Sequence, residues 1–300
     1  MASNRSLAVA QRRARGLVAS AVLAVAGLLT TSCSSSDTIS TDVTPPAIAA
    51  SPTAPVSGYD GLSRAPLSSY GTSEHDSDLL FEARKTLVIR CMKSRGNKTY
   101  SGQNITRVAA NIGKEALRPV GAWGYIGRAT AKTKGFHTAI VAPGRAGDGS
   151  RYRQKDFQAC STETDKELPT LAESDGSRLT QNLFNQSFQQ TAADKRVVDA
   201  RKRWATCMTA AGHPAGGPEE LAAGPWDTAQ PTAQEIAAAT AAESCTASSL
   251  LAAVYFAVLA GYQRQLIIAN SAALNTYQQQ VDKNMDKVAR LLAEGTGNAP

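Results

Sequence analysis

The strongest constraint on the fold is a cysteine motif, C-M-x-x-x-G, that occurs twice in the chain. It stands at Cys91–Gly96 and at Cys207–Gly212, and each copy ends a helix-like stretch and is followed by one more cysteine. Four cysteines allow three disulfide connectivities. The repetition favours pairing within each half. We therefore expect Cys91–Cys160 and Cys207–Cys245, each stabilising the fold by about 4 kcal/mol through the loop that it closes.

A four-ligand metal site is the alternative use of these cysteines. Structural zinc sites place their cysteines in close pairs, two to four residues apart, and the sequence contains no such pair. An even set of cysteines is typical of exported, oxidised proteins. The sequence therefore predicts two disulfides, no metal site and no cofactor.

The first 32 residues have the pattern of an export signal. Four arginines and no acidic residue stand among the first fifteen positions, and an apolar run follows at Leu17–Leu29. This run is shorter than the roughly 20 residues of a membrane span and fits the core of a signal peptide. Thr30-Thr31-Ser32-Cys33 then resembles the lipobox of bacterial lipoproteins, with Leu29 one place earlier than the usual aliphatic residue. The resemblance implies a diacylglycerol on the sulfur of Cys33.

Two alternatives stay open for this segment. An ordinary secretory signal cut nearby would release a free protein, and the Arg12-Arg13 pair hints at twin-arginine export in place of the general secretory route. The interpretation of Thr30–Cys33 as a lipobox predicts that Cys33 anchors the protein at the outer face of the cytoplasmic membrane. The membrane is then its first predicted partner.

The net charge does not indicate a nucleic-acid partner. The chain has 32 basic and 25 acidic residues, and four of the arginines lie in the signal segment. Its removal leaves 28 basic and 25 acidic residues, a net charge of only about +3. Nucleic-acid binding needs a clustered basic face, and the short basic runs at 151–155 and 195–203 are expected to be solvated helix surface.

The remaining composition predicts a tether followed by an all-α domain. Residues 33–75 are rich in Ser, Thr, Pro and Ala, and we expect a disordered linker there. Residues 76–294 are expected to form a disulfide-linked helical domain, with sub-units at about 76–170 and 171–294. Residues 295–300 are expected to form a flexible tail.

Three long helices are predicted within this domain. The first runs from about Asp76 to Arg95, with Ser77 or Asp78 as its cap. The second spans about 177–211, and a long C-terminal helix runs from Pro231 to Glu294 with a kink near 246–249.

The C-terminal helix contains two apolar features. A coiled-coil-like seam steps by three and four residues and is a candidate contact for an envelope protein partner. Its members are Leu274, Tyr277, Val281, Met285, Val288 and Leu292. The second feature, Leu250–Tyr262, is too short for a membrane span, and we expect a helix buried within the bundle.

Together these features resemble a family of secreted lipoproteins of unknown function from high-GC Gram-positive bacteria. The resemblance covers most of residues 76–294 and is carried by the lipobox, the tether, the two C-M-x-x-x-G motifs and Trp204, three residues before Cys207. It implies a helical, disulfide-linked extracytoplasmic domain and no established activity. We expect Trp204 to pack against the neighbouring disulfide.

No catalytic motif stands out in the sequence. The three histidines, His75, His137 and His213, are not spaced as metal ligands on one helix, and neither a G-x-S-x-G elbow nor a phosphate loop occurs. We therefore assign no catalytic residue. A cell-wall hydrolase that uses a pair of unrecognised carboxylates remains the alternative.

The candidate binding surface is a set of aromatic and imidazole side chains on glycine-rich loops: Trp123, Tyr125, Phe136 and His137. Exposed aromatic residues on loops stack on sugars or dock peptides, and a small-ligand carrier would use them in this way. The opposite interpretation is that they cover the core of the first half. The leading hypothesis is a non-enzymatic binding or scaffolding module of the cell envelope.

Overall fold

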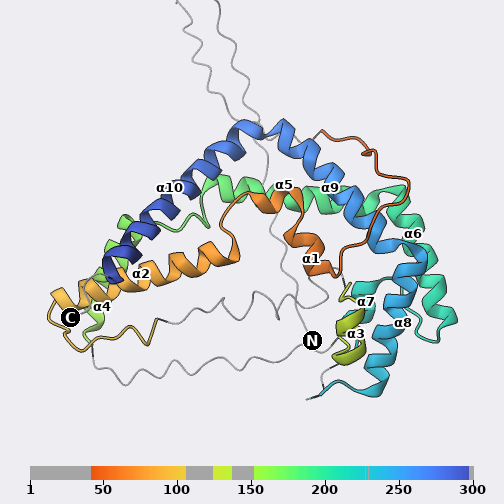
Figure 1. Ribbon diagram of the computed structural model, residues 1–300, viewed down its shortest axis with the longest axis horizontal. Coiled ribbons are helices and arrows are strands. Elements are labelled where there is room, and N and C mark those ends of the chain that lie inside the picture. Colours follow the sequence, from red (N-terminus) through yellow and green to blue (C-terminus); the bar gives the residue numbers. More distant parts are fainter. Residues whose placement is uncertain (1–41, 106–123, 137–151, 227, 229, 297–300) are drawn as a thin grey trace, which may run out of the picture. The chain divides into compact units, whose positions relative to one another are not determined.

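The computed structural model describes residues 42–105, 124–136, 152–226, 228 and 230–296, and these residues are helical without a β-strand (Figure 1). The elements are α1 (Gly58–Ser63), the 3₁₀ helix η1 (Pro66–Ser69), α2 (Glu74–Ser94), α3 (Arg128–Thr133), α4 (Gln154–Glu167), α5 (Asp175–Ala193), α6 (Lys195–Ala210), α7 (Pro218–Ala222), α8 (Ala233–Ser249), α9 (Leu251–Ala269) and α10 (Ser271–Thr296). The predicted all-α fold with a long C-terminal helix is confirmed.

Helix α9 is the element around which the others pack. It contacts α1, η1, α5, α6, α8 and α10. Every residue from Leu251 to Gln263 is buried or half-buried. By length and composition α9 is apolar enough to cross a membrane, but more than half of its most apolar stretch is buried within the protein. This agrees with the interpretation of Leu250–Tyr262 as a core helix.

Both predicted disulfides are present. Cys91–Cys160 joins α2 to α4, and Cys207–Cys245 joins α6 to α8. Trp204 is fully buried in the same apolar cluster as Cys245, and its indole N–H donates to the Thr246 hydroxyl at 3.0 Å. The expectation that Trp204 packs beside a half-cystine is therefore correct.

The two longest predicted helices are each divided in the structure. The helix predicted over 177–211 breaks at Asp194, whose side chain accepts from the Arg196 N–H and so begins α6. The helix predicted over 231–294 breaks at Leu250 and at Asn270. Leu250 has a left-handed backbone (φ 59°), and the Asn270 side-chain amide donates to the Leu266 carbonyl. The break at Leu250 adjoins the kink expected at 246–249, whereas the apolar periodicity continues through Asp194 and Asn270 and did not locate those two breaks.

Helix α2 begins earlier than predicted. Ser73, and not Ser77 or Asp78, caps it through a reciprocal capping box with Asp76. The spacing S-x-x-D provides this pair of hydrogen bonds, which satisfy free backbone N–H groups at the helix start.

The prediction of a disordered linker is wrong for residues 42–75. Leu67 is fully buried among α5, α9 and α10 residues, and its N–H donates to the buried Gln263 side chain at 3.0 Å. The apolar residues of this segment are few, but Val43, Ile48, Leu62 and Leu67 pack in clusters that contain α9 residues, and α9 also offers polar side chains to the backbone. Residues 33–41, including Cys33, lie outside the described residues.

The C-terminal seam is buried within the same chain. Leu274, Tyr277, Val281 and Val288 are buried, and α10 packs on α2, α5 and α9. Leu291 completes the buried stripe, and Leu292 is only half-buried. The contacts of α10 with α2, and of α3 with α8, also join the two halves of the sequence, so 76–170 and 171–294 do not form separate bodies.

The apolar clusters and disulfides of the described residues all lie C-terminal to Cys33. The five apolar clusters and both disulfides fall between residues 43 and 292. Residues Ile39–Pro300 form one compact unit. A chain that begins at Ser34 therefore contains every packing contact that the structure shows.

The break at Leu250 gives a stability prediction. A branched residue in the left-handed region is strained by roughly 1–2 kcal/mol, whereas asparagine tolerates this conformation and is a favourable N-cap. Leu250 is 51% exposed, so little buried area is lost on substitution. We expect Leu250→Asn to raise the free energy of unfolding by about 1 kcal/mol in urea titrations. Leu250→Ala keeps the strained Cβ and should give no gain. An equal gain in both variants would contradict the strain argument.

Candidate functional site

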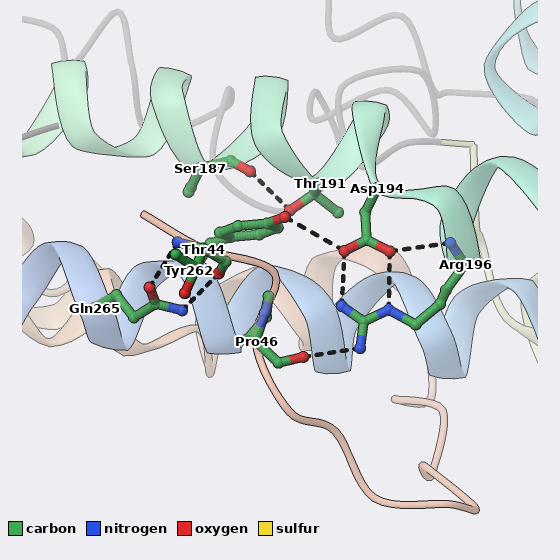
Figure 2. Close-up of polar contacts among 8 residues, drawn as sticks. All are labelled: Thr44, Pro46, Ser187, Thr191, Asp194, Arg196, Tyr262 and Gln265. Atoms are coloured by element: carbon green, nitrogen blue, oxygen red, sulfur yellow. Dashed lines mark hydrogen bonds and ion pairs between the residues drawn. The ribbon is translucent and has the colours of Figure 1, made fainter. Parts of the chain in front are cut away.

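The N-terminal segment 43–56, called the strap below, is attached to α9 by a reciprocal amide pair. The Thr44 N–H donates to the Gln265 side-chain oxygen at 3.0 Å, and the Gln265 side-chain nitrogen donates to the Thr44 carbonyl at 2.9 Å (Figure 2). A glutamine side chain here pairs with the backbone as a neighbouring strand would. The pair fixes where the strap starts along α9.

A partly buried ion pair holds the next residues of the strap. The Arg196 guanidinium donates twice to Asp194, at 2.8 and 2.6 Å, and once to the Pro46 carbonyl at 2.8 Å (Figure 2). The Tyr262 hydroxyl donates to the same carboxylate at 3.3 Å. The hydrogen bonds from Arg196 hold the pKa of Asp194 below its usual value. This network therefore connects the strap to the α5–α6 junction and to α9.

Close packing against glycine completes the contact at Pro46. A Cβ added to Gly261 on α9 would lie 2.4 Å from the Pro46 side chain. Only glycine permits this approach of strap and helix. The far end of the strap is held by Tyr125, whose hydroxyl donates to the Pro55 carbonyl at 2.8 Å and whose carbonyl accepts from the Gly58 N–H.

Between these two attachments the strap stands off α9 and leaves an open groove. The groove has a volume of about 530 Å³, within the range of small-ligand sites. Its residues come from the strap, α1 with the turn after it, and α9: Ala47, Ile48, Ala49, Pro52, Thr53, Ala54, Pro55, Gly61, Arg64, Ala65, Phe256, Ala257, Leu259, Ala260 and Arg264. The small side chains of Ala257 and Ala260 on α9 leave this space unfilled.

The groove has two positive charges and no negative charge in its lining. Arg64 is ion-paired with Asp60, one turn earlier on α1. Arg264 is exposed on α9 and forms no ion pair with any residue that the structure describes. The rest of the lining is apolar apart from Thr53. The arrangement is that of an apolar trough with cationic groups.

A second feature is the segment 124–136, which is seated on α7 and α8 by three left-handed glycines. A Cβ on Gly124 would meet the backbone of Pro218 at 2.4 Å, and one on Gly135 would meet the Glu235 side chain at 2.8 Å. The Gly127 N–H donates to Glu243 at 3.2 Å. The segment therefore packs on α7 and α8 too closely for residues with a Cβ at positions 124 and 135.

The carboxylates around this segment have structural partners. Glu235 is fully buried and completes the capping box of α8 with Thr232, although its second oxygen has no hydrogen-bond partner in the described residues. Glu219 is ion-paired with Arg201. Burial raises the pKa of Glu243 from 4.5 to about 7, because desolvation exceeds the opposing effect of N–H donation from Gly127 and Ile126.

The candidate surface of aromatic residues is not supported at the positions that the structure describes. Phe136 is only 4% exposed and stacks on Trp226, with ring centroids 5.8 Å apart. Tyr125 is half-buried beneath the strap. Both therefore belong to the packing that covers the core, and Trp123 and His137 lie outside the described residues. Trp226 is itself partly buried against the same apolar cluster.

One group of metal-ligand side chains comes together among the described residues. The sulfurs of Cys91 and Cys160 and a carboxylate oxygen of Glu163 lie within 4.8 Å of one another. Both sulfurs are joined in the disulfide, and Glu163 is ion-paired with Arg95. Disulfide sulfurs are not thiolate ligands, so the oxidised protein has a structural crosslink at this position.

Sequence reasoning missed the groove because its walls come from the segment assigned to the linker. The signal that could have indicated it is in α9, where Ala257, Ala260 and Gly261 place small residues along one side of an otherwise bulky apolar helix. A comparison with protein-family models, curated proteins and solved structures gives no match for this chain.

The raised pKa of Glu243 predicts a pH dependence of stability. Between about pH 4.5 and 7 the folded state holds a proton that the unfolded state has released, so the free energy of unfolding falls as pH rises, by about 3 kcal/mol. Glu243→Gln keeps an oxygen for the Gly127 N–H and does not titrate. We expect it to be more stable than the wild type at pH 8, relative to their difference at pH 4.5, in urea unfolding.

The matched control is Glu173→Gln, at an exposed carboxylate. It should leave the difference between pH 4.5 and pH 8 unchanged. If Glu243→Gln shows the same pH dependence as the wild type, the buried carboxyl does not titrate in this range.

Proposed function

We propose that this protein is a lipid-anchored, non-enzymatic binding module of the bacterial cell envelope, and that its ligand site is the groove between the strap and α9. The N-terminal arginines, the apolar run and the lipobox-like residues before Cys33 support the anchor. The groove is the observation that carries the binding function, because it is an apolar hollow of ligand size with cationic groups in its lining.

The position of the groove in the chain also fits a lipid anchor on Cys33. Cys33 precedes Asp42, the first described residue, by nine positions. The strap starts at Val43 and forms one wall of the groove. An anchor on Cys33 would therefore hold the groove near the membrane surface, in contact with molecules that leave or enter it.

The carboxylates around segment 124–136 favour a binding protein over a hydrolase. Glu243 accepts from loop N–H groups, Glu235 caps α8 and Glu219 pairs with Arg201. Each of these contacts holds a backbone segment or a neighbouring side chain. The non-enzymatic assignment rests on these structural roles and on the character of the groove.

The anchor is tested by labelling cells with radioactive palmitate and isolating the protein. We expect label in the wild type and in Ser34→Ala, and none in Cys33→Ser, because acylation requires the Cys33 sulfur. Label that persists in Cys33→Ser would show that the lipid is attached elsewhere. A wild-type protein without label would be a free secreted protein.

The site is tested by placing a photo-reactive residue in the full-length chain in intact cells. One variant carries it at Ala257 in the groove, and its control carries it at Arg290, which is exposed on α10. We expect a discrete increase in the intact mass of the purified Ala257 variant after irradiation, and none in the Arg290 variant. Equal adducts, or none at Ala257, would remove the groove as the ligand site.

A further inference from the structure

We infer that the α9 groove binds a single-chain anionic amphiphile, a molecule with one apolar chain and a carboxylate or phosphate head group. The inference rests on the proposed function and adds to it the chemical class of the ligand. It follows from the two kinds of side chain that line the groove and from how they are held.

The walls and floor of the groove suit an apolar chain. Phe256 and Leu259 are buried in the floor, and Ile48 contributes to the strap wall. Pro52 and Pro55 have no backbone N–H, so they remove two donors that a polar ligand would use. The larger part of the exposed lining is apolar, so burial of a hydrocarbon chain on these side chains would favour binding.

The charges in the lining select the head group. Arg264 lies in the lining without an ion-pair partner among the described residues, and no acidic residue lines the groove. Arg64 pairs with Asp60 through one side of its guanidinium. A guanidinium has five N–H donors in a planar fork, so both arginines can donate to an added carboxylate or phosphate. A cationic head group would meet the like charge of Arg264, which no carboxylate among the described residues offsets.

The groove is kept open by close contacts beside it and within its lining. Gly261 packs on Pro46 before the hollow begins, and Gly61 packs on the Phe256 ring, where a Cβ would lie 2.5 Å away. The Gln265–Thr44 and Arg196–Pro46 hydrogen bonds hold the strap on the same side. None of these polar groups needs to move for a chain to enter, so the site is formed before the ligand arrives.

The test uses the chain from Ser34 to Pro300 without lipid, which contains all of the described residues and the contacts among them. Sodium dodecanoate and dodecyl phosphate, below their micelle concentrations, are titrated by calorimetry, and dodecyltrimethylammonium is the probe of opposite charge. We expect both anionic probes to bind with one site per chain and the cationic probe to bind at least about 10-fold more weakly. Tighter binding of dodecanoate would indicate a fatty-acid ligand, and tighter binding of dodecyl phosphate would indicate a lipid with a phosphate head group.

Two variants place the binding in the groove. Ala260→Trp fills the hollow and should abolish binding of both anions. Arg264→Met keeps the apolar stem and removes the charge, so it should weaken the anions about 10-fold and reduce the difference from the cationic probe. Arg290→Met removes an exposed charge on α10, outside the groove, and should change nothing. Thermal unfolding of each variant shows that it is folded.

The inference is overturned if the cationic probe binds as tightly as the anions, or if folded Ala260→Trp and Arg264→Met both bind like the wild type. Failure of the ligand class is distinct from failure of the proposed site. Adducts at Ala257 in cells, together with no anion preference in calorimetry, would keep the groove as a binding site and reject the amphiphile. The absence of adducts at Ala257 would reject the site itself.

Discussion

The need to cover α9 determines how the rest of the described chain is arranged. From Leu251 to Gln263 this helix carries no charged residue, and its side chains point to all sides. Such a helix is stable in water only when neighbouring elements remove its apolar surface from solvent. α5, α6, α8 and α10 cover part of it. The remainder is covered by α1, η1 and the strap, which are too short and irregular to fold by themselves.

Polar residues in the C-terminal half of α9 fix the position of the irregular segments that cover it. Tyr262, Gln263 and Gln265 face different elements, and they bond to Asp194, to Ser187 and Leu67, and to Thr44 respectively. The backbone of a non-helical segment needs partners when it packs on a helix, because the helix has already used its own N–H and C=O groups. Side-chain amides supply these partners. The strap thus has a fixed register on α9, and the hollow beneath it has a fixed shape.

The sequence predicted the elements that are specified by local patterns of residues. It missed the elements whose structure depends on contacts with residues distant in the chain. The disulfides followed from a repeated motif, and the buried α9 followed from an apolar run of limited length. The packing of the strap and of η1 could not be predicted, because Pro46 and Leu67 stand among Ser, Thr and Pro residues with the composition of a linker. Only their contacts with Gly261 and Gln263 on α9 show that they are packed. The same holds for Phe136, which is aromatic and lies next to glycines but is buried against Trp226.

The seated strap changes what an anchor on Cys33 would do. A free linker from Cys33 to Asp76 would allow a separation of up to roughly 150 Å, at about 3.5 Å per residue. With the strap packed from Val43 onward, only nine steps remain between Cys33 and Asp42, and these span at most about 30 Å whatever their conformation. The same contacts that shape the groove would then also set its distance from the bilayer. A ligand with one apolar chain would then pass from the membrane into a groove held close to the bilayer surface. A long free tether would not hold the groove at that distance.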